Sequence, residues 1–228
     1  VIAAHSGAGA SSVALAIADA VAASGRLAGL VETAHPVRTG LVAAATAELG
    51  ADPSGSWRRG LRCHIGGADI TIARRASETA PDGWPALSDG VVVVDLGLPS
   101  PESLARVARS GCRVVAVCRP TVPGVRLMEQ LLSALPTAPV VIAAVGGGRW
   151  PGEVSASLGP RLRALRASNA VVTVPTDRRL EVTGPTSSPL PKPVAAAGRS
   201  LLGLIDAAHP GDATASAQSA PRKRGITR

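Results

Sequence analysis

The chain contains no tyrosine and no phenylalanine, and its 228 residues include only three tryptophans. Proteins that bind single-stranded nucleic acid stack the bases on aromatic side chains. This composition therefore argues against such a stacking surface. Cysteine is also scarce: the three residues at positions 63, 112 and 118 lack the paired spacing of a zinc site. We expect them to be structural, because free cysteines are commonly small buried thiols.

Long apolar runs are missing as well. No stretch of about 18 residues is free of charged and turn-forming residues, and no basic and apolar leader precedes the first strand-like segment. We therefore expect a cytoplasmic protein without a transmembrane segment. Hydrophobic residues make up 46% of the chain, which is enough for a core covered on both sides. The composition predicts a single domain over residues 1–208 and a disordered basic tail over residues 209–228.

The net charge is +8, and the tail holds four basic residues against one acidic residue. The remaining positive charge is spread along the sequence, which is typical of a solvated surface. It leaves DNA open as a partner. The arginines concerned are Arg58, Arg59, Arg62, Arg74, Arg75, Arg161, Arg163, Arg166, Arg178 and Arg179.

Buried strand-like runs alternate with helical segments, which predicts an α/β fold: a mostly parallel sheet with helices on both faces. We predict strands at 1–4, 27–32, 69–73, 91–95, 113–118, 139–145 and 170–174. We predict helices at 11–24, 38–49, 101–110, 124–135, 153–167 and 194–208. Residues 50–62 and 76–89 are rich in Pro, Gly, Ser and Asp and are predicted to be loops.

The first twelve residues carry the strongest functional signal. An apolar strand, Val1–Ala4, leads into His5–Ser12, a turn of small residues, and then into an alanine-rich helix. Glycines allow a tight turn that presents backbone N–H groups to an anion, and the helix N-terminus adds partial positive charge. This pattern predicts a phosphate-binding loop. A working loop of this kind carries a lysine that reaches the phosphates, and that position here is Ala10.

Asp95 follows the uniformly apolar run Val91–Val94 and is predicted to lie at the carboxyl end of a central strand that is buried on both faces. Ligands of open α/β sheets bind at that edge, so Asp95 and the loop would face one crevice. With a bound Mg-nucleotide, Ser11 would be the metal ligand and Asp95 its outer-shell support.

Several motifs occur in the order expected for the deviant Walker P-loop superfamily of MinD and ParA proteins. His5–Ser12 resembles its phosphate loop, and Val92–Pro99 resembles its second acidic motif. Val114–Thr121 is similar to the strand that follows, and Val172–Leu180 is similar to the proline-aspartate segment beside the adenine. The resemblance covers about residues 1–208 and is greatest to the CpaE/TadZ pilus-assembly branch.

The resemblance implies a site for ATP or ADP with Mg2+. The residues that would bind the nucleotide are Gly7, Ala8, Gly9, Ala10, Ser11, Ser12, Pro175 and Asp177, with Ser11 and Asp95 at the metal. It further implies a homodimer that recruits pilus, secretion or division machinery and is itself drawn to the membrane or pole through such partners.

The chain departs from the family pattern where catalysis would occur. Two lysines of the family loop are replaced by His5 and Ala10, and the paired carboxylates after the second strand are reduced to Glu32 beside Ala34. Gly146–Gly148 replaces the asparagine that reads adenine. Phosphoryl transfer depends on charge neutralisation and positioning. We therefore expect at most a slow ATPase, with Glu32 as its one candidate catalytic residue.

Each candidate residue also has a simpler interpretation. The serines after Gly9 could cap the helix without binding a ligand, Asp95 could cap the turn that follows it, and Glu32 could be a solvated loop carboxylate. Asp177 could serve only as a helix N-cap.

Two other functions stay open. One is a ParA-like partition ATPase that binds DNA non-specifically through its basic surface. The other is an NAD(P)-binding Rossmann enzyme, because Gly7, Gly9 and Ser12 followed by Glu32 resemble a dinucleotide fingerprint. The third glycine of that fingerprint is missing here, and no hydride-transfer constellation of His, Lys or Tyr is evident.

Overall fold

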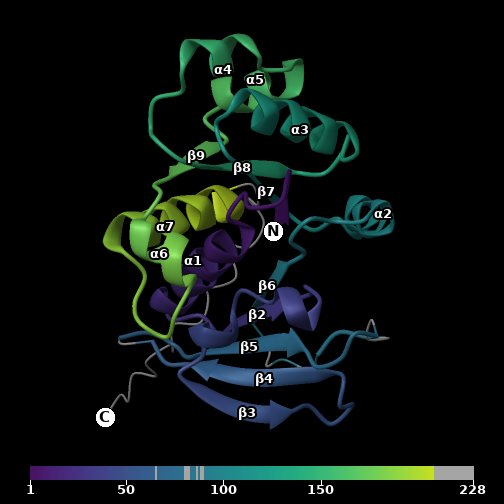
Figure 1. The fold of residues 1–228 in the computed structure, drawn as a ribbon, viewed down its shortest axis with the longest axis vertical. Coiled ribbons are helices and arrows are strands. Elements are labelled where there is room, and N and C mark those ends of the chain that lie inside the picture. Colours follow the sequence, from purple (N-terminus) through teal and green to yellow (C-terminus); the bar gives the residue numbers. More distant parts are fainter. Residues whose placement is uncertain (65, 80–82, 86, 88–89, 208–228) are drawn as a thin grey trace, which may run out of the picture.

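The fold was analysed in a computed structural model, which describes residues 1–207 except 65, 80–82, 86 and 88–89 (Figure 1). Its strands are β1 (Ile2–Ala3), β2 (Ala28–Glu32), β3 (Ala47–Ala51), β4 (Trp57–Arg62), β5 (Ile70–Arg75), β6 (Val91–Asp95), β7 (Val114–Cys118), β8 (Val140–Val145) and β9 (Val171–Val174). Its α-helices are α1 (Ala10–Ala23), α2 (Pro101–Ser110), α3 (Val122–Ser133), α4 (Gly152–Ala156), α5 (Pro160–Ala167), α6 (Arg178–Thr183) and α7 (Lys192–Ala207). Two 3-10 turns, η1 and η2, span Pro36–Arg38 and Val42–Ala44.

The strands form two ladders, in the orders β3-β4-β5-β2-β6 and β1-β7-β8-β9. The Ala3 N–H donates to the Gly97 carbonyl at 2.7 Å, and the Leu96 N–H donates to the Val1 carbonyl at 3.0 Å. These bonds place β1 between β6 and β7 and join the ladders. Strand pairing is antiparallel between β3 and β4 and between β4 and β5, and every other pairing, including that of β5 with β2, is parallel. The predicted α/β fold with a mostly parallel sheet is confirmed.

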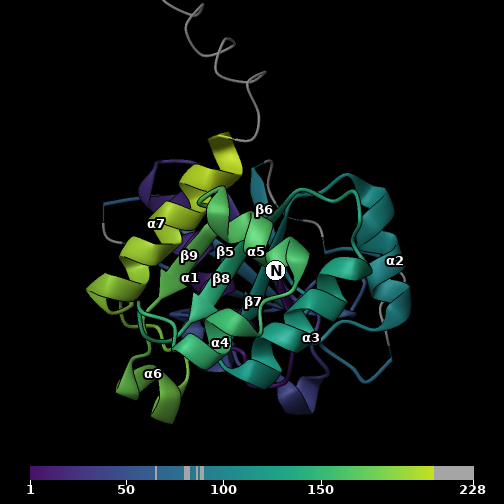
Figure 2. The ribbon, with the colours of Figure 1, turned by 90° about the horizontal axis from the view of Figure 1, so that it is seen from above.

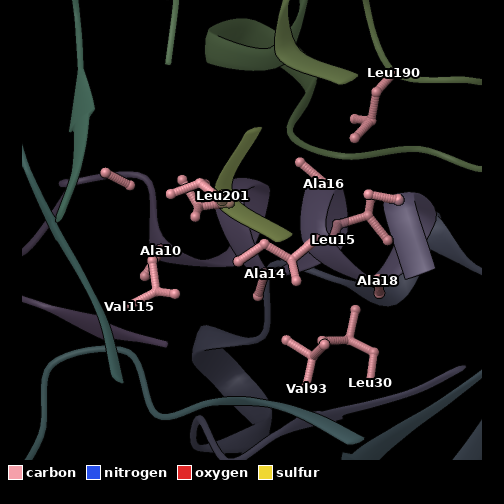
Figure 3. Close-up of a cluster of buried hydrophobic side chains, with 14 of the residues drawn as sticks. Ala10, Ala14, Leu15, Ala16, Ala18, Leu30, Val93, Val115, Leu190 and Leu201 are labelled. Carbon is pink, nitrogen blue, oxygen red and sulfur yellow. The ribbon is translucent and has the colours of Figure 1, made fainter. Parts of the chain in front are cut away.

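Helices cover both faces of the sheet, as predicted. Alternate side chains of a strand point to opposite faces, and in β7 Val115 and Val117 join the core around α1 and α7, whereas Ala116 and Cys118 join the core around α3, α4 and α5. Figure 2 shows α7 on one side of the central strands and α3 on the other. Figure 3 shows the first of these cores, which includes Leu30.

The segment between β2 and β5 differs from the prediction. The predicted helix at 38–49 and loop at 50–62 are replaced by the turns η1 and η2 and the hairpin of β3 and β4. Helix periodicity is broken here by Pro36 and Gly40. Every residue of β3 is exposed, so this edge strand has no buried alternation for a sequence pattern to reveal.

The predicted helix at 153–167 is two helices, α4 and α5, with Pro160 starting the second. The Glu129 carboxylate of α3 accepts hydrogen bonds from the backbone N–H groups of Arg161 and Leu162, at 2.9 and 3.0 Å. A long-range cap therefore fixes where α5 begins. Helix α6 was not predicted.

The predicted tail at 209–228 and part of the predicted loop at 76–89 lie outside the described residues. Over the part of the chain that the structure describes, none of the helices has the length and hydropathy needed to cross a bilayer.

Candidate functional site

The loop between β1 and α1 has the glycine turn predicted for it. Gly7 and Gly9 have φ values of 73° and 97°, a region in which side chains other than hydrogen are strained. A Cβ atom at Gly9 would also lie only 3.3 Å from Val145 Cγ2. Both the backbone conformation and the neighbouring strand therefore require glycine at position 9.

The N-terminus of α1 has no side-chain cap. The N-cap residue is Gly9 rather than a serine, and no side-chain hydrogen bond is made at this helix end within the described residues. The interpretation of Ser11 or Ser12 as the N-cap is therefore excluded. Unpaired N–H groups at a helix start, together with the helix dipole, favour an anion.

The other small residues of the loop point in three directions: into the core, toward a cleft, and toward Gly40. Ala8 and Ala10 are 1% and 6% exposed and pack in the core around α1, so only their backbone could contact a ligand. Figure 3 shows Ala10 in this core. Ser12 faces a cleft toward Pro175 and Asp177. Ser11 lies on the opposite side, where a Cβ atom on Gly40 would come within 3.6 Å of its Oγ.

The cleft beside the loop is small, about 130 Å3. It lies between the β1–α1 loop and the segment after β9, so that Gly9 and Ser12 share one cleft with Pro175 and Asp177. The lining residues with polar or charged side chains are Ser12, Arg119, Thr176, Asp177 and Glu181, and Gly9 and Pro175 also line the cleft. The Asp177 carboxylate also accepts a hydrogen bond from the Leu180 N–H at 3.1 Å, so it caps α6 as the simpler interpretation expected.

Three charged residues lie side by side at the carboxyl ends of neighbouring strands. Glu32 on β2 is in register with Asp95 on β6 and with Arg74 on β5. Each follows, at a spacing of two, residues that pack in the core around α1, so all three point to the α1 face. They are 1%, 2% and 7% exposed, respectively.

Glu32 is a buried structural acceptor rather than a solvated loop carboxylate, which corrects that interpretation. Its carboxylate accepts hydrogen bonds from the Thr39 hydroxyl and, at 2.7 Å, from the Gly40 N–H. Burial raises the pKa of Glu32, and the Asp95 charge raises it further, whereas the two hydrogen bonds and Arg74 oppose the shift. Glu32 thus holds the 39–40 segment against Ser11.

Asp95 makes the turn contact that its simpler interpretation predicted. The Gly97 N–H donates to Asp95 Oδ1 at 2.9 Å. Because the carboxylate has a second oxygen and lies on the α1 face, this capping role is compatible with support of a metal ion. No group of three or more His, Cys, Asp or Glu side chains is placed to hold a metal ion in the described ranges. A divalent cation here would need oxygens from a bound phosphate, which is how Mg2+ is usually held.

His5 uses both ring nitrogens inside the chain. Nε2 accepts a hydrogen bond from the Arg119 N–H at 3.2 Å, and Nδ1 lies 2.9 Å from the Ser6 carbonyl. Because Nε2 accepts, Nδ1 is the ring nitrogen left to donate to the Ser6 carbonyl. His5 therefore ties the loop to the residue that follows β7.

Sequence reasoning missed Arg119 as a site residue. It directly follows β7, and its Nε donates to the Gly7 carbonyl at 3.2 Å. Its guanidinium also approaches Glu181 of α6, with Nη2 3.4 Å from Oε1. The available signal was an arginine immediately after a buried strand, at the sheet edge where ligands bind.

Two arginines assigned to a solvated surface are buried, which corrects that prediction. Arg74 is one, and Arg62 is the other, at 3% exposed. Arg62 pairs with Asp19 of α1 through Nε at 2.8 Å and Nη2 at 3.0 Å. It also donates to the carbonyls of Ala44, Thr186 and Ser188.

No protein-family model matches the chain, and neither does any curated protein. Solved structures do. MinD from Aquifex aeolicus in a MinC:MinD complex is 14% identical, with a TM-score of 0.55, over 89% of this chain and 95% of that one. MinD from Pyrococcus horikoshii with Mg-ADP is 12% identical, with a TM-score of 0.55, over 90% and 95%. A putative plasmid partition protein of Borrelia burgdorferi bound to AMPPNP is 10% identical, with a TM-score of 0.54, over 91% and 98%.

The strand order differs from that of a Rossmann sheet. A Rossmann sheet places its first two strands side by side, whereas here β6 separates β2 from β1. Glu32 is therefore not on the strand next to the loop, as a dinucleotide fingerprint requires. The chain shares its fold with these MinD and plasmid partition structures.

Proposed function

We propose that the chain binds ATP or ADP with Mg2+ at the β1–α1 loop and acts as a positioning protein that recruits other machinery. The observation that supports this most strongly is the uncapped N-terminus of α1, which opens beside a cleft reaching Pro175 and Asp177. Structures with this fold hold Mg-ADP and AMPPNP.

The described residues fit such a ligand. Backbone N–H groups of residues 8–12 would surround the phosphates. The Ser11 hydroxyl would reach the metal ion, with Asp95 behind it, and bound Mg2+ would neutralise phosphate charge. The base would lie toward Pro175, where Gly146 leaves no side chain to read it.

Hydrolysis is proposed to be slow or absent. Ala10 is buried in the core, His5 is hydrogen-bonded at both nitrogens, and Glu32 is engaged with Thr39 and Gly40. No described residue is thus free at the three positions where the family resemblance expects a catalytic charge. Because the fold is kept while the catalytic residues are replaced or engaged elsewhere, a nucleotide-responsive protein or a pseudo-ATPase is favoured over an active ATPase.

Calorimetric titration with ATP, ADP and NADH in the presence of Mg2+ tests the proposal. We expect ATP or ADP to bind and NADH not to bind. Ser11→Ala and Asp95→Asn should weaken Mg-nucleotide binding by about tenfold, as expected for loss of a contact worth roughly 1.4 kcal/mol. Ser133→Ala, at the far end of α3, is the matched control. Absence of binding by every nucleotide would overturn the proposal.

We further propose that the recruited partners are pilus or secretion proteins, as in the CpaE/TadZ branch, or division-site proteins, and that the chain acts as a homodimer. MinD of the same fold is found in a complex with MinC. Light scattering of the purified protein with and without Mg-ATP tests the dimer. A mass equal to the monomer under both conditions would contradict it.

Non-specific DNA binding is a second candidate, favoured by the net charge of +8. Such binding releases counterions, so the logarithm of the binding constant should fall linearly with the logarithm of salt concentration. Titration of a random-sequence duplex at several salt concentrations tests it. Lack of binding at low salt would show that the charge serves only solubility.

A further inference from the structure

The nucleotide cleft lacks the cations that its fold resemblance leads one to expect. Ala10 and His5 stand where the family has lysines. Among the described residues that line the cleft, Arg119 is the one with a positive charge, and Asp177 and Glu181 contribute negative charge. A triphosphate entering this cleft would meet two carboxylates and a single guanidinium.

Arg119 is held against the loop from two directions. Its backbone N–H donates to His5 Nε2 at 3.2 Å, which fixes its main chain beside β1. Its side-chain Nε donates to the Gly7 carbonyl at 3.2 Å, so the guanidinium lies directly against the phosphate loop. The residue comes from the end of β7, the strand that pairs with β1.

The contact between Arg119 and Glu181 can be exchanged. The two groups are 3.4 Å apart, and their side chains are 43% and 47% exposed. Ion pairs with this exposure contribute little to stability. A phosphate offers a guanidinium two oxygens in a planar, bidentate geometry and carries more charge than one carboxylate.

We propose that Arg119 is the phosphate-binding cation of this site, replacing the missing loop lysine, and that Glu181 holds it when the site is empty. This inference rests on the proposed nucleotide binding. On ligand entry the guanidinium leaves Glu181 and turns to the phosphates while its backbone stays anchored by His5. Glu181 then acts as a competitor that sets the affinity.

Titration with Mg-ATP and with inorganic tripolyphosphate tests the assignment. Arg119→Ala should weaken the binding of both ligands by about tenfold or more, since hydrogen bonds to charged groups are stronger than those between neutral groups. Arg119→Lys should retain part of the affinity because it keeps the charge. Arg126→Ala, an exposed arginine of α3, is the matched control and should leave binding unchanged.

Glu181→Gln separates a binding role from a structural one. Because this substitution frees Arg119, the affinity for both ligands should rise by about threefold. If the effect acts through the guanidinium, the gain should disappear in the Arg119→Ala background. A purely structural pair would give weaker binding for both single variants. Thermal unfolding of each variant shows that it is folded.

The outcomes distinguish the inference from the function on which it rests. Equal nucleotide affinity in the wild-type protein and Arg119→Ala would overturn the role of Arg119 and leave nucleotide binding standing. Loss of ATP binding with unchanged tripolyphosphate binding would place Arg119 at the base end and also overturn the assignment. A wild-type protein that binds neither ligand would overturn both.

Discussion

Glu32 couples the fold to pH at the scale of a single residue. Its pKa is raised in the folded protein, chiefly by burial, so the folded state binds this proton more tightly than the unfolded state does. The free energy of unfolding should therefore fall as pH rises from the carboxyl's ordinary value through the raised one. We expect Glu32→Gln, which keeps an oxygen for the Gly40 N–H, to remove this loss.

Urea unfolding of both proteins from pH 4 to pH 7 measures the effect. The stability of Glu32→Gln relative to wild type should increase with pH over that range. A difference that is constant with pH would show that Glu32 titrates alike in the folded and unfolded states.

The three cysteines should differ sharply in reactivity. Burial raises the pKa of the Cys118 thiol to about 12, whereas Cys63 and Cys112 are exposed. The thiolate is the reactive form, and at pH 8 a thiol with that pKa is ionised in roughly one molecule in ten thousand. We expect a thiol reagent to label two cysteines quickly in the native protein and the third only after denaturation. Fast labelling of three would contradict the buried position of Cys118.

At the scale of elements, the contact between α1 and α7 depends on one glycine. A Cβ atom at Gly198 of α7 would lie 2.3 Å from the Ala16 carbonyl oxygen of α1. Gly198→Ala should push the helices apart and cost about 1–3 kcal/mol, as overpacking does. Gly203, in the same helix, has no atom within 4 Å of such a Cβ.

Gly203→Ala should therefore stabilise the protein by about 0.5–1 kcal/mol through helix propensity alone. Chemical unfolding of the two variants measures the change in the free energy of unfolding, which should fall for Gly198→Ala and rise for Gly203→Ala. Equal changes for the two substitutions would mean that the helices do not approach closely at Gly198.

Elements were predictable where one local pattern decides them. The run at 91–95 forms β6 as predicted, although Val92 is 46% exposed, so that the strand is not buried on both faces. The turn before α1 follows from Gly7 and Gly9, both of which have positive φ. Strand β3 was missed because none of its side chains is buried, and the break before Pro160 was missed because the cap at α5 comes from Glu129, in another helix. Tertiary contacts decided both.

The same distinction between local patterns and tertiary contacts applies to the residues of the candidate site. The glycine loop and Pro175, which line one cleft, each follow a strand that the sequence predicted, and Pro175 was named from the family resemblance. Arg119 was missed because its role exists only once β7 pairs with β1. The buried state of Arg62 and Arg74 was missed because their partners, Asp19 and Glu48, are distant in sequence.

At the scale of the whole molecule, nucleotide binding should appear as stability. A ligand that binds only the folded state adds about 2.7 kcal/mol at a free concentration of 100 times its Kd. For a domain of this size that corresponds to a rise in Tm of about 5–10 °C. Thermal scans over a series of Mg-ATP concentrations measure it. A Tm that stays constant through concentrations that saturate the site in calorimetry would contradict binding to the folded state alone.

Arg62 has a consequence for the rates of folding and unfolding. It joins β4 to α1 and to carbonyls 124 and 126 positions away, and such distant contacts form only after most of the chain is ordered. Its hydrogen bonds should be absent from the transition state, so Arg62→Ala should speed unfolding while leaving refolding nearly unchanged. Stopped-flow measurements of both rates test this. The pair of Arg62 and Asp19 would then set how long the native protein lasts rather than how quickly it forms.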